Sequence, residues 1–302
     1  MKYLIVGAGG VGGAIGGFLA AAGKDVELIL RGENLEAVRE HGLKLHSDLI
    51  GEKILPVAAF STQNYSGSPD VVFVCVKGYS LDGVLPFLQK ISHPGMIVVP
   101  ILNIYGTGEA LAEHLPHLTV ADGCIYIVSY LSGKGEVTQA GTIFRIVFGM
   151  PDEKNPAVFD QIKKDLTESG IGAVVSDNIR RDCLQKLACV SPMAATGAFY
   201  DATMGEIRSD PEMRGVYARL IGEISALADA MGLSFAVDVV AENLKILDNV
   251  TPDTTASMQK DLKRGSQTEM DGLIFEIVRL GKQYGVATPE YERIARHFGM
   301  KQ

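Results

Sequence analysis

Short, continuously apolar runs alternate with helix-like periodicity through the first half of the chain. The strand-like runs are residues 2–6, 26–30, 71–76, 96–100 and 120–128. The helix-like stretches between them are residues 11–22, 35–41, 81–91 and 108–114. Strands that are apolar on both sides and are separated by helices predict a parallel sheet with both faces covered.

The pattern changes in the second half of the chain. Two more strand-like runs, a helix and a last strand are expected at residues 136–139, 144–148, 157–169 and 173–176. From about Asn178 helical periodicity continues almost to the end, interrupted by proline and glycine breaks that mark helix termini. We therefore predict a doubly wound, Rossmann-type α/β domain over residues 1–177. An all-helical domain for substrate binding and dimerisation is predicted over residues 178–302.

The first strand runs into a glycine-rich turn of the Gly-x-Gly-x-x-Gly type, Gly7-Ala8-Gly9-Gly10-Val11-Gly12. In such a loop Gly7 permits the turn, Gly9 allows close approach of a pyrophosphate, and Gly12 lets the helix pack on the strand. The helix N-terminus then supplies unpaired N–H groups to the phosphates. Strand, turn and helix in this order predict a dinucleotide site; a purely structural turn of a flavodoxin-like domain is the alternative.

Three polar residues follow later strands, at the sheet edge where a dinucleotide lies. The second strand is followed by Arg31 and lacks the carboxylate that holds the ribose 2′-OH in NAD enzymes. A guanidinium fits a 2′-phosphate, so NADP(H) is the expected cofactor, although Arg31 could also be a solvated surface residue. Lys77 is expected to contact the cofactor, and Asn103 follows the next strand, where it could equally form a turn.

Composition narrows the function further. The net charge of −8 argues against nucleic-acid binding, and no apolar run is long enough to cross a bilayer. The four cysteines lack metal or redox spacing, the six histidines form no zinc set, and the chain starts directly with a strand. We expect a cytoplasmic protein without a metal site. A homodimer is left open, because the sequence does not fix the oligomeric state.

Taken in order, these residues resemble the ketopantoate reductase (2-dehydropantoate 2-reductase) family over essentially the whole chain. The resemblance continues beyond the residues above through Gln185-Lys186-Leu187-Ala188, Ser257-Met258-Gln259-Lys260-Asp261-Leu262, Thr268-Glu269-Met270-Asp271 and Tyr284-Gly285-Val286-Ala287-Thr288-Pro289. In that family NADPH delivers a hydride to the C2 ketone of a 2-oxo acid in pantothenate and coenzyme A biosynthesis. The resemblance therefore implies an NADP-dependent oxidoreductase acting on CH–OH groups, with 2-dehydropantoate as its default substrate.

The resemblance also implies roles for individual residues. Lys186 becomes the general acid, and Asn103 lies beside both nicotinamide and substrate. Ser257 binds the substrate carboxylate, Glu269 lies near the reacting centre and contacts cofactor or substrate, and Ser129 contacts the cofactor. Each has a plainer explanation: Lys186 could reach solvent along its alkyl stem, Glu269 could stabilise a helix N-terminus, and Ser257 could be an N-cap.

The chain departs from the family pattern beside the lysine. Val190 and Ala194 stand where the family carries asparagines, four and eight residues after Lys186 on the same helix face. Two hydrogen-bonding groups are replaced by apolar ones, which leaves the reaction type intact and the substrate open. A dehydrogenase of another 2-oxo acid, a β-hydroxyacid or an amino acid remains an alternative. So does a catalytically silent NADP-binding sensor, although a sensor needs no general acid.

Overall fold

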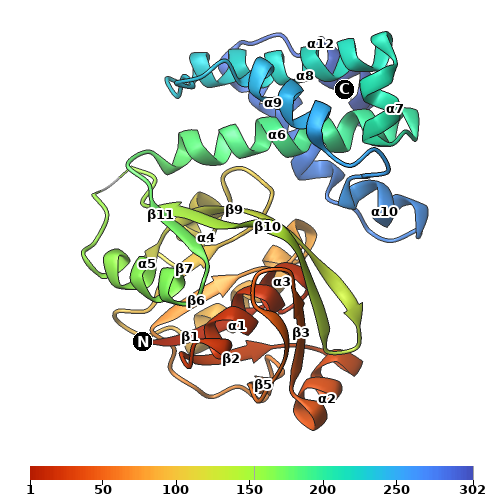
Figure 1. Cartoon of the computed structure of the whole chain (residues 1–302). Helices are drawn as coiled ribbons and strands as arrows, with labels where there is room; N and C mark the ends of the chain where they lie inside the picture. The colour runs from red at the N-terminus through yellow and green to blue at the C-terminus, as the bar shows by residue number, and fades with distance from the viewer. Residues whose placement is uncertain (153, 302) are drawn as a thin grey trace. The chain divides into compact units, whose positions relative to one another are not determined.

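The computed structural model describes residues 1–152 and 154–301 and divides into two compact units (Figure 1). The first unit comprises residues 1–102 and 106–179, and the second comprises residues 103–105 and 180–302. The first is α/β and the second is helical, which confirms the predicted fold class. Among the described helices, none is long and apolar enough to cross a membrane.

The first unit contains a six-stranded sheet in the order β5-β2-β1-β6-β7-β8, parallel throughout. Its strands are Lys2–Val6 (β1), Asp25–Ile29 (β2), Ala58–Phe60 (β5), Val71–Val74 (β6), Ile97–Pro100 (β7) and Thr119–Val120 (β8). Helical segments of this unit are Gly10–Ala21 (α1), Gly32–His41 (α2), Gly78–Ser80 (η1, a 3-10 turn), Leu81–Ile91 (α3), Thr107–His114 (α4) and Val158–Glu168 (α5). Alternate strand residues face opposite sides: Ile5 packs in the core with α1, whereas Leu4 packs in the core with α3 and α4.

A second, five-stranded sheet belongs to the same unit. It contains Leu43–Ser47 (β3), Gly51–Leu55 (β4), Asp122–Gly133 (β9), Glu136–Gly149 (β10) and Gly172–Val175 (β11). The two runs expected at residues 136–139 and 144–148 form one long strand, β10, with a register irregularity between Ala140 and Phe144. The single run expected at 120–128 is instead divided between β8 and β9.

Helix α1 lies between the two sheets, contacting β1 and β2 on one side and β3, β4, β9 and β10 on the other. Its glycines allow both contacts. A Cβ on Gly16 would lie 2.6 Å from the side chain of Leu28 on β2, and one on Gly13 would lie 2.6 Å from Val137 on β10. A larger residue at either position would push a sheet away, because real Cβ atoms do not approach so closely. Small residues on both faces thus fix how closely the helix packs.

The second unit consists of helices around one apolar core. Its elements are Ile179–Tyr200 (α6), Met204–Ser209 (α7), Pro211–Ala230 (α8), Val239–Asn249 (α9), Ser257–Lys263 (α10), the π-helical turn Asp271–Phe275, Glu276–Tyr284 (α11) and Pro289–His297 (α12). Residues 103–105 pack with this unit: the side chain of Ile104 lies against Gly272, where a Cβ would come within 2.6 Å of it.

Candidate functional site

Four neighbouring strands of the parallel sheet are each followed by a residue that the sequence singled out. In the order β2-β1-β6-β7, the strands lead to Arg31, the loop beginning at Gly7, Lys77 and Asn103. Chain order reverses between β1 and β6, since β2 lies on one side of this pair and β7 on the other. Ligands of open α/β sheets bind beyond the carboxyl ends of the strands at such a reversal. The topology therefore places the glycine loop at the expected position.

The loop geometry accounts for two of its glycines. Gly7 has φ +88°, in the left-handed region that favours glycine, and a Cβ there would lie 2.7 Å from Cγ1 of Val76. A Cβ on Gly12 would lie 2.5 Å from the carbonyl oxygen of Gly7 and 2.9 Å from Ile5. Gly7 thus makes the turn and Gly12 allows the helix to pack on the strand. Ala8, between them, is buried, and its amide donates to the carbonyl of Ile29 at 3.3 Å.

The N-terminus of α1 suits a dinucleotide pyrophosphate. Gly9 is the N-cap, no side chain of the described residues caps the helix, and the first turn, which begins with Gly10 and Val11, contains no acidic residue. In the part of the chain that the structure describes, a Cβ added at Gly9 would meet no atom within 4 Å, so the space beside it is open to a ligand. Uncapped N–H groups and the positive end of the helix dipole together favour a phosphate. The residues present therefore fit the pyrophosphate of a pyridine nucleotide.

Ser129 on β9 lies beside this loop. Its carbonyl oxygen is 2.9 Å from the point that a Cβ of Gly10 would occupy, and the backbone of Tyr130 is equally close. The hydroxyl of Ser129 is buried and has no hydrogen-bond partner in the described part of the chain. A buried hydroxyl without a partner costs stability, so a group that pairs with it on binding gains affinity. The structure therefore places Ser129 beside the glycine loop.

Arg31 occupies the N-cap position of α2 and is exposed. The acidic residue closest to it in sequence, Glu33, is engaged elsewhere: its carboxylate accepts a hydrogen bond from the Lys134 ammonium at 2.7 Å. Glu33 therefore does not stand in for the carboxylate that NAD enzymes place at the end of the second strand. The guanidinium of Arg31 remains the charged group at this strand end.

Lys77 lies further from its strand than the expected run 71–76 suggested, whereas the strand before Asn103 ends at Pro100 as expected. Strand β6 ends at Val74, and Lys77 directly precedes η1 with a partly exposed side chain. Strand β7 ends at Pro100, and Asn103, also partly exposed, opens the short segment that packs with the second unit. Both residues are thus carried by loops beyond the sheet.

Asp122 is a buried carboxylate that sequence reasoning did not single out. It lies 3% exposed at the start of β9 and accepts hydrogen bonds from the amide of Gly123 at 2.9 Å and the hydroxyl of Thr107 at 3.4 Å. Burial raises the pKa of Asp122 to about 7, against the opposing effect of backbone hydrogen bonds from Gly123 and Gly108. Since Thr107 and Gly108 begin α4, Asp122 anchors the N-terminus of the helix that follows the Asn103 segment.

In the second unit, Lys186 lies on a partly exposed stripe of α6. The stripe continues through Cys189, Val190 and Met193, three, four and seven residues further along the helix. Burial raises the pKa of the Cys189 thiol, while the positive charge of Lys186, three residues earlier on the same helix, opposes that shift. Ala194, by contrast, is 2% exposed and belongs to the core, so Val190 alone of the two replaced positions lies on the stripe.

Glu269 precedes the π-helical turn and is only 6% exposed. Gly272, three residues later, contacts Ile104, the neighbour of Asn103 in sequence. The second unit therefore brings the Asn103 segment and the Glu269 segment together. Ser257 is exposed and is the first residue of α10, whose N-cap is Ala256, so capping does not explain Ser257.

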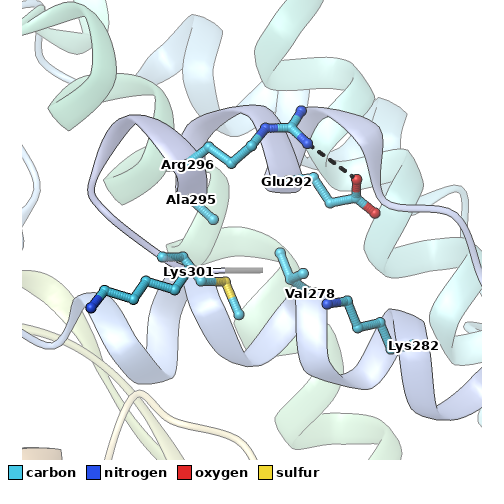
Figure 2. Close-up of a pocket in the computed structure, with 7 residues that line it drawn as sticks. Val278, Lys282, Glu292, Ala295, Arg296 and Lys301 are labelled. Atoms are coloured by element: carbon cyan, nitrogen blue, oxygen red, sulfur yellow. Dashed lines mark ion pairs between the residues drawn. The ribbon is translucent and has the colours of Figure 1, made fainter.

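Two surface pockets contain none of these residues. One, of about 300 Å³, is bordered by α11, α12 and the residues after α12, as Figure 2 shows. Lys282 lines it, and within it Arg296 pairs with Glu292 at 3.8 Å. The other, of about 480 Å³, lies between the end of α2 and strands β4 and β5. Within residues 1–152 and 154–301, no three His, Cys, Asp or Glu side chains form a group that could hold a metal.

Comparison with known proteins finds a family model that matches each unit. The family model "Ketopantoate reductase PanE/ApbA" matches residues 3–153, and "Ketopantoate reductase PanE/ApbA C terminal" matches residues 178–302. The chain belongs to the ketopantoate reductase family. It is accordingly an oxidoreductase acting on CH–OH groups, of the pyridine-nucleotide-dependent kind.

Similar proteins span the whole chain. An uncharacterized oxidoreductase of Bacillus subtilis (strain 168), YkpB, is 29% identical, covering 99% of this chain and 98% of its own. A 2-dehydropantoate 2-reductase of Aquifex aeolicus (strain VF5) is 26% identical, covering 100% and 97%. The structure of a D-mandelate dehydrogenase with NADH and anilino(oxo)acetate is 26% identical with a TM-score of 0.88, covering 98% and 96%. Proteins with a similar sequence and fold are thus named for different substrates, 2-dehydropantoate and D-mandelate.

Substituting the two central glycines of the loop should separate ligand binding from folding. Gly9→Ala should leave the melting temperature unchanged, because its Cβ meets open space, yet weaken nucleotide binding by filling the approach to the helix N-terminus. Gly10→Ala should lower the melting temperature, because its Cβ would lie 2.7 Å from the backbone of Tyr130. Thermal unfolding and nucleotide titration by fluorescence measure the two effects. If folded Gly9→Ala binds nucleotide as tightly as the wild type, the pyrophosphate does not bind at the N-terminus of α1.

Proposed function

We propose that this protein reduces a 2-oxo acid to the 2-hydroxy acid with NADPH as hydride donor. The reference substrate is 2-dehydropantoate, whose reduction gives pantoate for coenzyme A biosynthesis. The observation that carries the proposal is that one helical unit contains both a partly exposed Lys186 and a buried Glu269. Support also comes from the nucleotide-compatible loop of the first unit and from relatives named as 2-dehydropantoate 2-reductases.

The bound cofactor would supply a hydride to C2 of the 2-oxo acid. The carbonyl oxygen gains negative charge as the C–H bond forms, and it must receive a proton to become the hydroxyl. The ammonium of Lys186 can donate that proton from Nζ and stabilise the charge before the transfer. Glu269 would orient the reacting groups, Asn103 would lie beside nicotinamide and substrate, and Ser257 would bind the substrate carboxylate.

NADPH is preferred over NADH in this proposal because Arg31 follows the second strand, where no carboxylate takes its place. The loop residues Gly7 to Gly12 would hold the pyrophosphate, with Lys77 and Ser129 contacting the rest of the nucleotide. The hydroxyl of Ser129, buried without a partner among the described residues, is suited to this contact.

A second candidate substrate class is a 2-oxo acid with an apolar or aryl side chain. Val190 and Met193 border Lys186 on α6, and neither offers a hydrogen bond to a hydroxyl on the far end of a substrate. The D-mandelate dehydrogenase of similar structure was solved with anilino(oxo)acetate, an aryl compound. The apolar side chains of Val190 and Met193 favour this class over a β-hydroxyacid or an amino acid.

Arg31→Ala should raise the KM for NADPH by about 10-fold to 100-fold, the range expected for losing a hydrogen bond to a charged group. The KM for NADH should change little, because NADH has no 2′-phosphate. Steady-state kinetics with both nucleotides provide the measurement. Glu33→Gln, which alters a charge two residues away that is paired with Lys134, is the matched control and should leave the preference intact. Equal effects of Arg31→Ala on both nucleotides would contradict the assignment.

Lys186→Ala should lower kcat by about 10²-fold to 10⁴-fold, the range for loss of a positioned general acid. NADPH binding should remain nearly intact, because the proton is transferred in the chemical step. Single-turnover kinetics and nucleotide titration separate the two quantities. A wild-type protein that binds NADPH but reduces no 2-oxo acid would instead support the silent sensor, and activity of Lys186→Ala within a few-fold of wild type would assign the proton to another group.

A panel of substrates tests whether Val190 borders the far end of the substrate. Wild-type kcat/KM for 2-dehydropantoate should exceed that for its deoxy analogue 2-oxo-3,3-dimethylbutyrate by only about 10-fold to 200-fold, as expected of an apolar pocket. Val190→Asn should widen the ratio by pairing the hydroxyl, whereas Val190→Ala, which changes volume without adding a donor, should not. A wild-type preference of about 10⁴-fold or more would mean that other residues bind the hydroxyl.

A further inference from the structure

A chain of two buried hydroxyls connects the lysine helix to the segment that follows Glu269. Ser191 lies five residues after Lys186 on α6 and is 0% exposed. Its hydroxyl oxygen is 2.5 Å from the carbonyl oxygen of Leu273 in the π-helical turn and 2.6 Å from the hydroxyl oxygen of Tyr291 on α12. Tyr291 is also 0% exposed, so all three groups meet inside the core of the second unit.

The direction of this chain follows from the chemistry of its members. The Leu273 carbonyl can only accept, so the Ser191 hydroxyl donates to it. Ser191 has a single proton to donate, and therefore the hydroxyl of Tyr291 donates to Ser191. Burial raises the pKa of Tyr291 well above its usual range, which keeps this donor protonated.

Tyr291 is itself held in place from another helix. The carboxylate of Glu223 on α8 accepts hydrogen bonds from the amides of Glu290 and Tyr291, at 2.8 and 3.1 Å, in the first turn of α12. A carboxylate at a helix N-terminus is favoured by the orphan amides and by the helix dipole. The hydroxyl chain therefore starts from an anchored helix and ends on the Leu273 carbonyl.

The π-helical turn is where such an anchor has the largest consequence. The amide of Leu273 donates to the carbonyl of Glu269 at 2.9 Å, and the amide of Glu276 donates to Asp271, five residues back. A π-helical turn is rare in proteins and is found mostly as single turns, frequently at functional sites. Fixing Leu273 thus fixes the backbone on which Glu269 is mounted.

We propose that Ser191, supported by Tyr291, is a positioning residue that holds the Glu269 segment in register with the Lys186 helix. This inference rests on the proposed function for its catalytic consequence. Its physical content, a hydroxyl on α6 that fixes the π-helical turn, does not depend on that function. Ser191 touches neither cofactor nor substrate in this role and acts through the backbone of Leu273.

The same core supplies matched controls. Thr196, on the same helix as Ser191, is also 0% exposed, but its hydroxyl has no partner among the described residues. Tyr217 on α8 is also 0% exposed, and its hydroxyl has no hydrogen-bond partner within residues 1–152 and 154–301. Thr196→Val and Tyr217→Phe therefore remove buried hydroxyls that donate to no group among the described residues, whereas Ser191→Ala and Tyr291→Phe remove hydroxyls of the hydrogen-bonded chain.

The loss of kcat in each variant should depend on the place of its hydroxyl in the hydrogen-bonded chain. Ser191→Ala should lower kcat about 10-fold or more, as expected when reacting groups lose their alignment, with the KM for NADPH unchanged. Tyr291→Phe should have a smaller effect, because Ser191 can still donate to Leu273. Thr196→Val and Tyr217→Phe should retain wild-type kcat.

A double variant separates positioning from stability. Ser191→Ala leaves the Tyr291 hydroxyl buried without its partner, so its melting temperature should fall, and adding Tyr291→Phe should restore part of that loss. The kcat should not recover with it, because the Leu273 carbonyl still lacks its donor. If kcat recovers together with the melting temperature, Ser191 contributes only to stability and the proposal is wrong.

Hydrogen exchange gives a readout that does not require catalysis. The amides of Leu273 and Glu276 should exchange faster in Ser191→Ala than in wild type, and at the wild-type rate in Thr196→Val. Unchanged exchange in Ser191→Ala would overturn the proposal. If the wild type reduces no 2-oxo acid while exchange responds as expected, the proposed function fails and the anchoring of the Glu269 segment stands.

Discussion

The packing of α1 between two sheets is the constraint on which the first unit depends. Gly12 and Gly16 lie against Ile5 and Leu28 of the parallel sheet, while Gly13 lies against Val137 of the other sheet. With side chains absent from both faces, the helix packs closely on both sheets. At the N-cap of the same helix, Gly9 leaves the space beside the helix N-terminus open. Close packing and nucleotide binding therefore both require glycine in this one helix.

The parts of the fold that could be predicted are those with local signals. Strand β1 and the turn at Gly7 were predicted because an apolar run, a glycine turn and a small-residue helix follow one another directly. Strands β3, β4 and β5 were missed, since their burial arises from distant partners. Lys44 of β3 pairs in register with Glu136 of β10, and Glu52 of β4 is exposed. Strand β4 shows little apolar alternation, because four of its five residues are exposed, and the alternation of β3 extends only from Leu43 to His46.

The candidate site divides in the same way. The glycine loop and Arg31 follow from pattern and chemistry, whereas Lys186, Ser257 and Glu269 were singled out only through family resemblance. No rule of spacing would have found Ser191 and Tyr291, which lie 100 residues apart in sequence and meet through a hydrogen bond. Nor could the sequence separate Val190 from Ala194, because both share a helical face and only the packed core shows that Ala194 is covered.

Helix α6 combines two roles that are separable in principle. Under the proposed function, its partly exposed stripe carries the proton donor Lys186 together with Val190 and Met193, which border the substrate. Its buried face carries Ser191, which fixes the Glu269 segment. A change at Val190 alters what lies beside the proton donor without touching the hydroxyl that anchors the π-helical turn. Substrate preference can therefore change through residues on the exposed stripe of α6, while Ser191 on the buried face keeps the reacting groups aligned. This separation is consistent with reductases and a mandelate dehydrogenase sharing this architecture.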